Sequence, residues 1–107
     1  MDKDFLVTTT ENVGDYDYQI VGPVFGITVM SRNALADAGA NLKSKFGGEL
    51  KGYTKLGYRS RQEAIKRMVV NAQSMGADAV VMMRFDSNLD ENGNESVVAY
   101  GTAVKMQ

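Results

Sequence analysis

A helix-ending glycine that leads directly into an apolar run is the feature that most restricts how this chain can fold. The run is SMGADAVVMMRFD, residues 74–86. Before it, apolar and charged side chains recur at helical spacing, which predicts an amphipathic helix from Lys51 or Tyr53 to Ser74. Gly76 suits the left-handed backbone position that follows a last helical turn. The sequence therefore predicts a long helix that ends just before a strand.

Asp78 is the polar interruption between that glycine and the predicted strand over residues 79–86. Its carboxylate can accept hydrogen bonds from backbone donors freed at the junction, so we interpret it as a structural cap. The polar segment 87–95 then predicts a hairpin turn, and SVVAYGTAVKM, residues 96–106, predicts the partner strand.

Two more strands are predicted near the N-terminus, over residues 5–9 and 16–29. The second shows the alternation of apolar and polar residues that a strand with one buried face requires. Gly22 and Pro23 interrupt it and indicate a bend, a bulge or an edge strand, because proline cannot donate to a ladder. Gly26 marks a second weak point, or a place where another backbone comes close.

A further helix is predicted from Arg32 to Phe46, with Ser31 as its N-cap and Gly47-Gly48 as its stop. The order of elements is then strand, strand, helix, helix, strand, strand. Strands that are neighbours in sequence usually pair. We therefore predict one α+β domain over residues 1–107, with an antiparallel four-stranded sheet and two helices packed on one face.

Charge and apolar content argue against several classes of partner. The 12 lysines and arginines nearly balance the 13 aspartates and glutamates, which provides no electrostatic footprint for nucleic acid. The acidic N-terminal residues lack the apolar segment of a signal peptide, and no apolar run reaches the roughly 18 residues of a membrane span. The sequence predicts a soluble, cytoplasmic protein that binds neither nucleic acid nor membranes.

The chain has no cysteine and no histidine, so the commonest metal ligands and the commonest general base are missing. Residues 86–95 carry several oxygen side chains, as a calcium loop does. However, Glu91 stands where such a loop needs glycine, and Val97 stands where it needs a bidentate glutamate. The stretch FGGELKG, residues 46–52, matches no phosphate-binding fingerprint and is interpreted as a helix stop and a turn.

The seven methionines raise the alternative of a copper(I) site, because thioether sulfur is a soft ligand. Their positions favour core packing instead. Met68 and Met75 fall on the apolar face of the long helix, and Met82 and Met83 fall in the strand that follows it. The sequence predicts no cofactor, and no nucleophile with a base is visible that would predict an enzyme.

Three residues are the candidates for contact with a small ligand or ion: Tyr53, Arg61 and Asp78. The guanidinium of Arg61 could hold an anionic ligand, although an ion pair within or between subunits is the favoured alternative. Two hypotheses for function follow. The protein is a non-catalytic oligomeric binding protein, or it is an assembly and interaction module without a small ligand.

Small and aromatic residues along nearly the whole chain resemble the pattern of the YbjQ-like family. The matching features are Gly47-Gly48, Tyr53, Arg61, Ala64, Ala72, GADAVV from Gly76, GTAVK from Gly101, VGPVFG at 21–26 and SRNALAD at 31–37. Two positions depart from the family pattern. Thr54 stands where the family commonly has glutamate, and Met82 stands where it commonly has glycine.

The resemblance implies an α+β subunit in a ring-like homo-oligomer, typically a pentamer, from a family described as heavy-metal-binding. The chain itself offers methionine, carboxylate and amine donors only, which are poor ligands for zinc, cadmium or mercury. Association also has a physical motive. The strands AVVMMRF and SVVAYGTAV are apolar on both faces, and two helices cannot cover both faces of a four-stranded sheet. We therefore predict a homo-oligomer without a metal site, and the resemblance implies that it is a pentamer.

Overall fold

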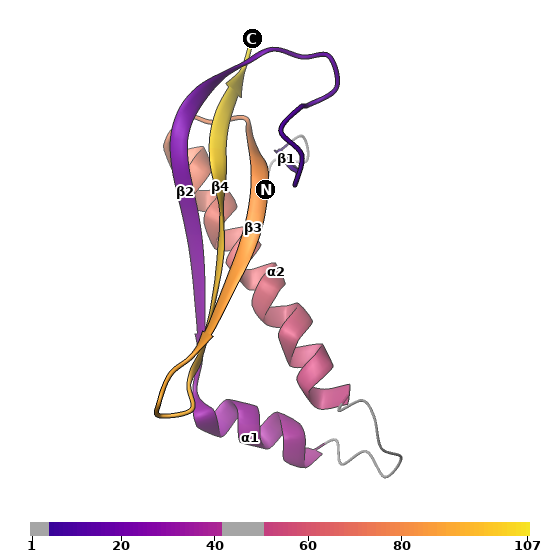
Figure 1. The fold of residues 1–107 in the computed structure, drawn as a ribbon, viewed down its shortest axis with the longest axis vertical. Helices are drawn as coiled ribbons and strands as arrows, with labels where there is room; N and C mark the ends of the chain where they lie inside the picture. The colour runs from indigo at the N-terminus through magenta and orange to yellow at the C-terminus, as the bar shows by residue number, and fades with distance from the viewer. Residues whose placement is uncertain (1–4, 42–50) are drawn as a thin grey trace.

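The computed structural model describes residues 5–41 and 51–107 of the chain. Its elements are, in order, β1 (Leu6–Val7), β2 (Tyr18–Met30), α1 (Arg32–Asn41), α2 (Lys51–Ser74), β3 (Ala79–Leu89) and β4 (Glu95–Met106), as Figure 1 shows. The predicted order and types of the elements are confirmed. The predicted first strand is shorter than expected, and the predicted end of the first helix at Phe46 and its stop at Gly47-Gly48 lie outside the described residues.

The sheet is mixed, so the prediction of a wholly antiparallel sheet is wrong. The strand order is β1-β3-β4-β2, and the two-residue β1 pairs parallel with β3, with Leu6 opposite Ala79. The first two strands do not pair with each other, because β2 lies antiparallel to β4 at the opposite edge. The chain between them crosses the end of the sheet (Figure 1), where the hydroxyl of Tyr18 donates to the Glu11 carbonyl and the Gln107 amide donates to the Asp17 carbonyl.

The start of α1 and the end of α2 lie at the predicted capping residues. The Ser31 Oγ accepts a hydrogen bond from the Ala34 amide at 3.1 Å, as an N-cap should. At the end of α2, Gly76 has a φ of 80°, and the amides of Gly76 and Ala77 donate to the carbonyls of Gln73 and Ala72. This pair of bonds is the Schellman arrangement, which satisfies the last carbonyls of the helix.

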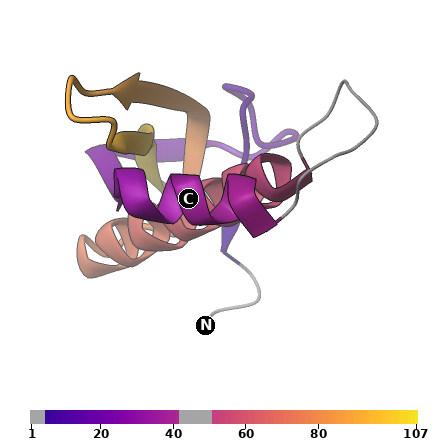
Figure 2. The same cartoon turned by 90° about the horizontal axis from the view of Figure 1, so that it is seen from below.

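The main core lies between α2 and one face of the sheet, which form the two layers seen in Figure 2. Its fully buried members include Val24, Ala64, Met68, Ala72, Val80, Val97, Ala99 and Ala103. Gly26 permits the contact, since a Cβ atom there would overlap the Ala64 carbonyl oxygen and the Met68 amide nitrogen. This confirms that Gly26 marks the close approach of another backbone. The expectation that both helices pack on the sheet is wrong for α1, which packs mainly against α2.

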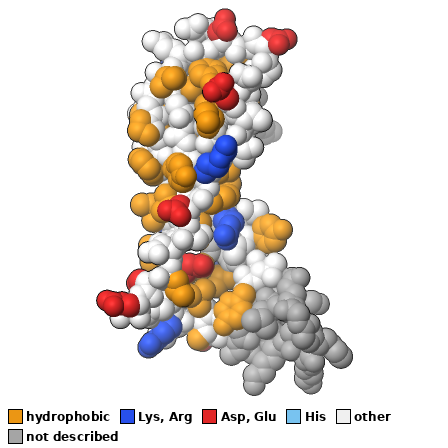
Figure 3. Space-filling model, in the orientation of Figure 1, with side chains coloured by type: hydrophobic (Ala, Val, Ile, Leu, Met, Phe, Trp, Pro, Cys, Tyr) orange, Lys and Arg blue, Asp and Glu red, His pale blue; other side chains and the backbone are white. Residues whose placement is uncertain are grey.

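The other face of the sheet is only partly covered. At one end, a small cluster of Ala79, Val81 and Val104 is covered by side chains of the N-terminal crossing and the strand ends. Along the rest of β2, Phe25, Ile27 and Val29 are 53%, 49% and 64% exposed and alternate with residues that face α2. Figure 3 shows hydrophobic side chains gathered on this side of the molecule. We call the surface formed by Ile20, Phe25, Ile27, Val29, Val98 and Tyr100 the open sheet face.

Register shifts in β2 and β3 change the direction in which nearby side chains point. The register between β2 and β4 shifts between Ile20 and Gly22, which confirms the predicted bulge, and β2 is an edge strand as its proline indicated. In β3 a second shift falls between Val81 and Arg84, where Met82 has a φ of 55°. Met82 is therefore turned outward and exposed, and Met75 at the end of α2 is exposed as well, so the assignment of these two residues to the core is wrong. Met68 and Met83 are buried as predicted.

Candidate functional site

Asp78 lies where α2 gives way to β3, and its hydrogen bonds connect that junction to the end of β4. Its amide donates to the Val104 carbonyl at 2.8 Å. Its Oδ2 accepts from the Met106 amide at 2.9 Å. The helix end itself is closed by backbone bonds, so Asp78 caps the last residues of a strand rather than α2. Asp78 therefore accepts a backbone hydrogen bond as expected, but the donor belongs to the end of β4 and not to the helix junction. Its contact with a ligand stays a prediction.

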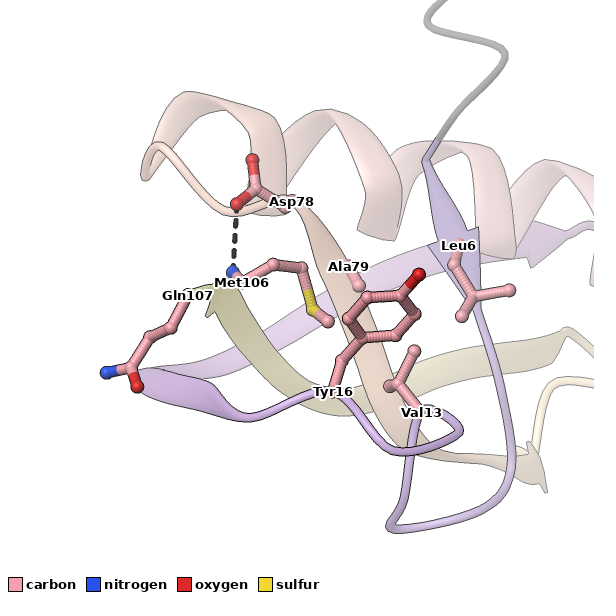
Figure 4. Close-up of a pocket in the computed structure, with 7 residues that line it drawn as sticks. All are labelled: Leu6, Val13, Tyr16, Asp78, Ala79, Met106 and Gln107. Carbon is pink, nitrogen blue, oxygen red and sulfur yellow. Dashed lines mark hydrogen bonds between the residues drawn. The ribbon is translucent and has the colours of Figure 1, made fainter.

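A groove of about 320 Å³ opens beside Asp78, between the N-terminal crossing and the ends of β3 and β4. It is lined by Leu6, Val13, Tyr16, Asp78, Ala79, Met106 and Gln107, which Figure 4 draws as sticks. Leu6 lies at one end of the group, and Asp78 and Gln107 lie at the other. Most of these side chains are apolar, so the groove suits an apolar group. Asp78 is the only aspartate or glutamate among the lining residues.

Arg61 uses its guanidinium inside its own chain. One terminal nitrogen, Nη1, donates to the Gly57 carbonyl at 3.3 Å, and Nη2 contacts the Ser87 Oγ at 3.5 Å. The guanidinium carbon also lies 5.7 Å from the centre of the Phe85 ring, within the range of a cation–π contact. These contacts fasten α2 to the exposed half of β3. The expected ion pair within the chain is not formed among the described residues, because the partners of Arg61 there are a carbonyl, a hydroxyl and an aromatic ring.

The three candidate residues do not form one site within a chain. Tyr53 lies exposed in the first turn of α2, and Asp78 follows the last turn of the same helix. At 1.5 Å per residue, the helix separates Tyr53 from its own end by roughly 30 Å, and Arg61 from that end by roughly 20 Å. A ligand site that uses all three residues would need contributions from neighbouring chains.

A second hollow, of about 400 Å³, lies between the end of β2 and the facing parts of α1 and α2. Its lining residues are Thr28, Met30, Ala34, Leu56, Arg59, Ser60 and Glu63. Ser60 is buried, and its hydroxyl lies 2.7 Å from the Leu56 carbonyl oxygen and 3.1 Å from the Met30 sulfur. Sequence reasoning missed this hollow because its serine and threonine carry no motif. Only the burial of Ser60 among β2, α1 and α2 distinguishes it.

The hairpin between β3 and β4 is held by its own aspartate. Asp90 Oδ1 accepts from the amides of Asn92 and Asn94, and Oδ2 accepts from the Asn94 side chain. The hydrogen bond from the Asn94 amide is the largest cause that lowers the pKa of Asp90 below its usual range, and the other Asn92 and Asn94 bonds act in the same direction. These donors occupy the oxygens that a cation would need, which agrees with the interpretation of this segment as a turn.

Comparisons with known proteins give a consistent family assignment without an activity. A UPF0145 protein of Lactobacillus gasseri is 57% identical over 106 residues, which covers 99% of this chain and 98% of that protein. A UPF0145 protein of Enterococcus faecalis is 55% identical over 100 residues, with 94% and 97% covered. A crystal structure of a DUF74-family protein of unknown function from Pediococcus pentosaceus shares the fold, with a TM-score of 0.66 at 15% identity over 94% of this chain and 96% of that one.

The family whose profile matches residues 5–107 is described as "Putative heavy-metal-binding". The donors present do not fit such a metal. The chain has neither cysteine nor histidine, and in residues 5–41 and 51–107 no three acidic residues come together in a group that could hold an ion. No helix of these segments is long and apolar enough to cross a membrane. The match over nearly the whole chain and the identity of more than half to several relatives place this protein in the YbjQ-like family.

Proposed function

We propose that this protein is a non-catalytic homo-oligomeric subunit, and that its copies associate through the open sheet face. The observation that carries the proposal is the row of Phe25, Ile27 and Val29 along β2, each about half exposed or more. Isolated apolar residues on a surface are ordinary, but a contiguous apolar patch is typical of an interaction site. The number of five subunits comes from the family resemblance alone. The proposal also includes a closed ring and a cytoplasmic location.

The outer edge of β2 is partly blocked by side chains of α2, which supports association through the face of the sheet rather than through this edge. An edge strand presents unpaired backbone groups that can recruit another strand. Here the Asn71 Oδ1 accepts from the Phe25 amide at 3.1 Å, and the Arg67 Nη1 donates to the Ile27 carbonyl at 2.6 Å. Side chains of α2 therefore occupy the middle of this edge. The apolar side chains of the same residues stay available on the open sheet face.

The test compares two exposed positions of equal accessibility. Val29 and Leu89 are each 64% exposed, but only Val29 belongs to the open sheet face. We expect Ile27→Lys/Val29→Lys to be folded and monomeric by light scattering, and Leu89→Lys to keep the wild-type mass. A wild-type protein that stays folded at the 11.7 kDa monomer mass over a wide concentration range would refute the proposal.

A second candidate is the binding of a small ligand near the start of α2, where Tyr53 and Arg61 were predicted to act. The hollow lined by Arg59, Ser60 and Glu63 supports it, because it offers a cation, a hydroxyl and a carboxylate in one place. Native mass spectrometry of the purified protein tests this candidate. A retained ligand would appear as an added mass that Arg61→Ala or Arg59→Ala removes and the distant Lys105→Ala keeps.

A further inference from the structure

The charges of this protein are strongly segregated between α2 and the rest of the chain. Residues 51–74 contain six lysines and arginines and one glutamate, a net charge of +5. The whole chain carries −1, so the remaining residues together carry −6. A nearly neutral protein thus consists of one basic helix and an acidic remainder. Such an arrangement favours contacts in which the helix of one molecule meets the acidic part of another.

The exposed side of α2 displays its free basic groups in a line. Two of the helix arginines are engaged within the chain, Arg61 with Gly57 and Phe85, and Arg67 with Glu63 and Ile27. Among the described residues, no hydrogen bond or ion pair engages the side chains of Lys55, Arg59 or Lys66. We call the exposed residues at spacings of three and four the basic stripe: Lys55, Arg59, Gln62, Lys66, Val70 and Gln73.

The open sheet face lies on the opposite side of the molecule and has acidic groups within it and at its ends. Asp86 of β3 lies on this face, because it pairs with Val98, which pairs with Ile27. Exposed Glu91 lies at the hairpin, and Asp15 and Asp17 lie at the other end of the sheet. Figure 3 shows acidic side chains at both ends of this side of the molecule. The Arg84 guanidinium on the same face donates to the carbonyls of Thr9 and Met83.

We infer that the basic stripe of one copy packs against the open sheet face of the next copy. This inference rests on the proposed function, since it names the partner surface of the same association. Because the two surfaces are different and lie on opposite sides of α2 and the sheet, the contact is head-to-tail. A head-to-tail contact generates a closed ring or a filament, whereas stacking of two open sheet faces would stop at a dimer. Exposed Val70 and the stems of the lysines supply apolar area against Phe25 and Ile27.

A charge-reversal experiment with rescue tests the inference on the full chain. Lys55→Glu/Lys66→Glu should raise the dissociation constant of the assembly at least roughly tenfold in low salt, measured by sedimentation during dilution. Arg59 is left unchanged, because it lines the hollow of the second candidate function. The matched control Lys55→Arg/Lys66→Arg keeps both charges and should assemble as the wild type does. Circular dichroism and a thermal melt verify that each variant is folded.

Reversing the charges of the acidic partners in the same chain tests whether the two surfaces contact each other. Adding Asp86→Lys/Glu91→Lys to Lys55→Glu/Lys66→Glu should restore assembly, because the two surfaces then attract with exchanged signs. If Lys55→Glu/Lys66→Glu assembles like the wild type while Ile27→Lys/Val29→Lys does not, the inference is wrong and the proposed function stands. A monomeric wild type would refute both. A wild-type assembly that carries nucleic acid and falls apart with nuclease would assign the stripe to nucleic acid and overturn the inference.

Discussion

Replacement of Gly26 by alanine tests whether close contact between β2 and α2 determines the stability of this fold. A Cβ atom at position 26 would overlap the Ala64 carbonyl oxygen and the Met68 amide nitrogen and would lie 3.0 Å from the Met68 Cα. All three are backbone atoms, which cannot rotate away as the end of a side chain can. To accept one methyl group, α2 as a whole would have to move away from β2.

The expected loss of folding stability follows from the fact that the new Cβ atom would collide with backbone atoms. Overpacking of a core commonly costs about 1–3 kcal/mol, and a collision with helix backbone belongs at the upper end, at about 3 kcal/mol. For a domain of this size that loss corresponds to a fall in melting temperature of roughly 12 to 24 °C. Differential scanning calorimetry at one fixed protein concentration measures it, because association makes the melting temperature depend on concentration.

Gly57→Ala is the matched control, since the same substitution at this position should raise the stability of the protein instead of lowering it. Gly57 lies inside α2, and its added methyl would find its nearest neighbour, the Arg61 Nη1, at 3.5 Å. Glycine in a helix interior is about 1 kcal/mol less favourable than alanine, so this variant should melt higher than the wild type. A Gly26→Ala protein that melts within a few degrees of the wild type would show that the packing argument is wrong.

Three further predictions concern Asp78, Asp90 and metals. Asp78→Ala should lower stability by about 1 kcal/mol in denaturant titration, because it removes the acceptor of the Met106 amide, while Asp78→Asn keeps an acceptor and should lose less. If Asp78→Ala instead melts normally and loses a bound ligand, Asp78 is a site residue. Because the pKa of Asp90 is lowered in the folded hairpin, its carboxylate stabilises the hairpin above the ordinary value of 3.8, and this contribution is lost as the pH falls through the lowered pKa. By NMR, the amide signals of Asn92 and Asn94 should shift with this titration in the wild type and should not shift in Asp90→Asn. Wild-type signals that stay unchanged until the protein unfolds would contradict this prediction. Zinc, cadmium and copper(II) should bind weakly or not at all near neutral pH in calorimetry of the protein without a histidine tag, whereas stoichiometric binding tighter than micromolar would show that carboxylates of several chains converge.

Local sequence determined the elements of this protein and their ends. The spacing of apolar residues between 51 and 74 predicted α2, since only one face of a helix can meet a core. Ser31 and Gly76 predicted a helix start and a helix end, because each satisfies backbone groups within a few residues. Gly22-Pro23 likewise indicated the bulge and the edge position of β2. The helix start and helix end depend on contacts between neighbours in the chain, whereas the bulge and the edge position of β2 also need its pairing with β4.

Only the tertiary structure decided what lies beside what. The pairing of β1 with β3 depends on a crossing over the sheet end, which no local pattern encodes. Met82 appeared to belong to the core by its position in an apolar run, but the register shift between Val81 and Arg84 turned its side chain outward. The length of α2 keeps Tyr53 and Asp78 apart, and the burial of Ser60 arises where α2 packs against the distant β2–α1 segment. Burial, register and surface charge are properties of the packed chain, because they depend on which distant segments exclude water from one another.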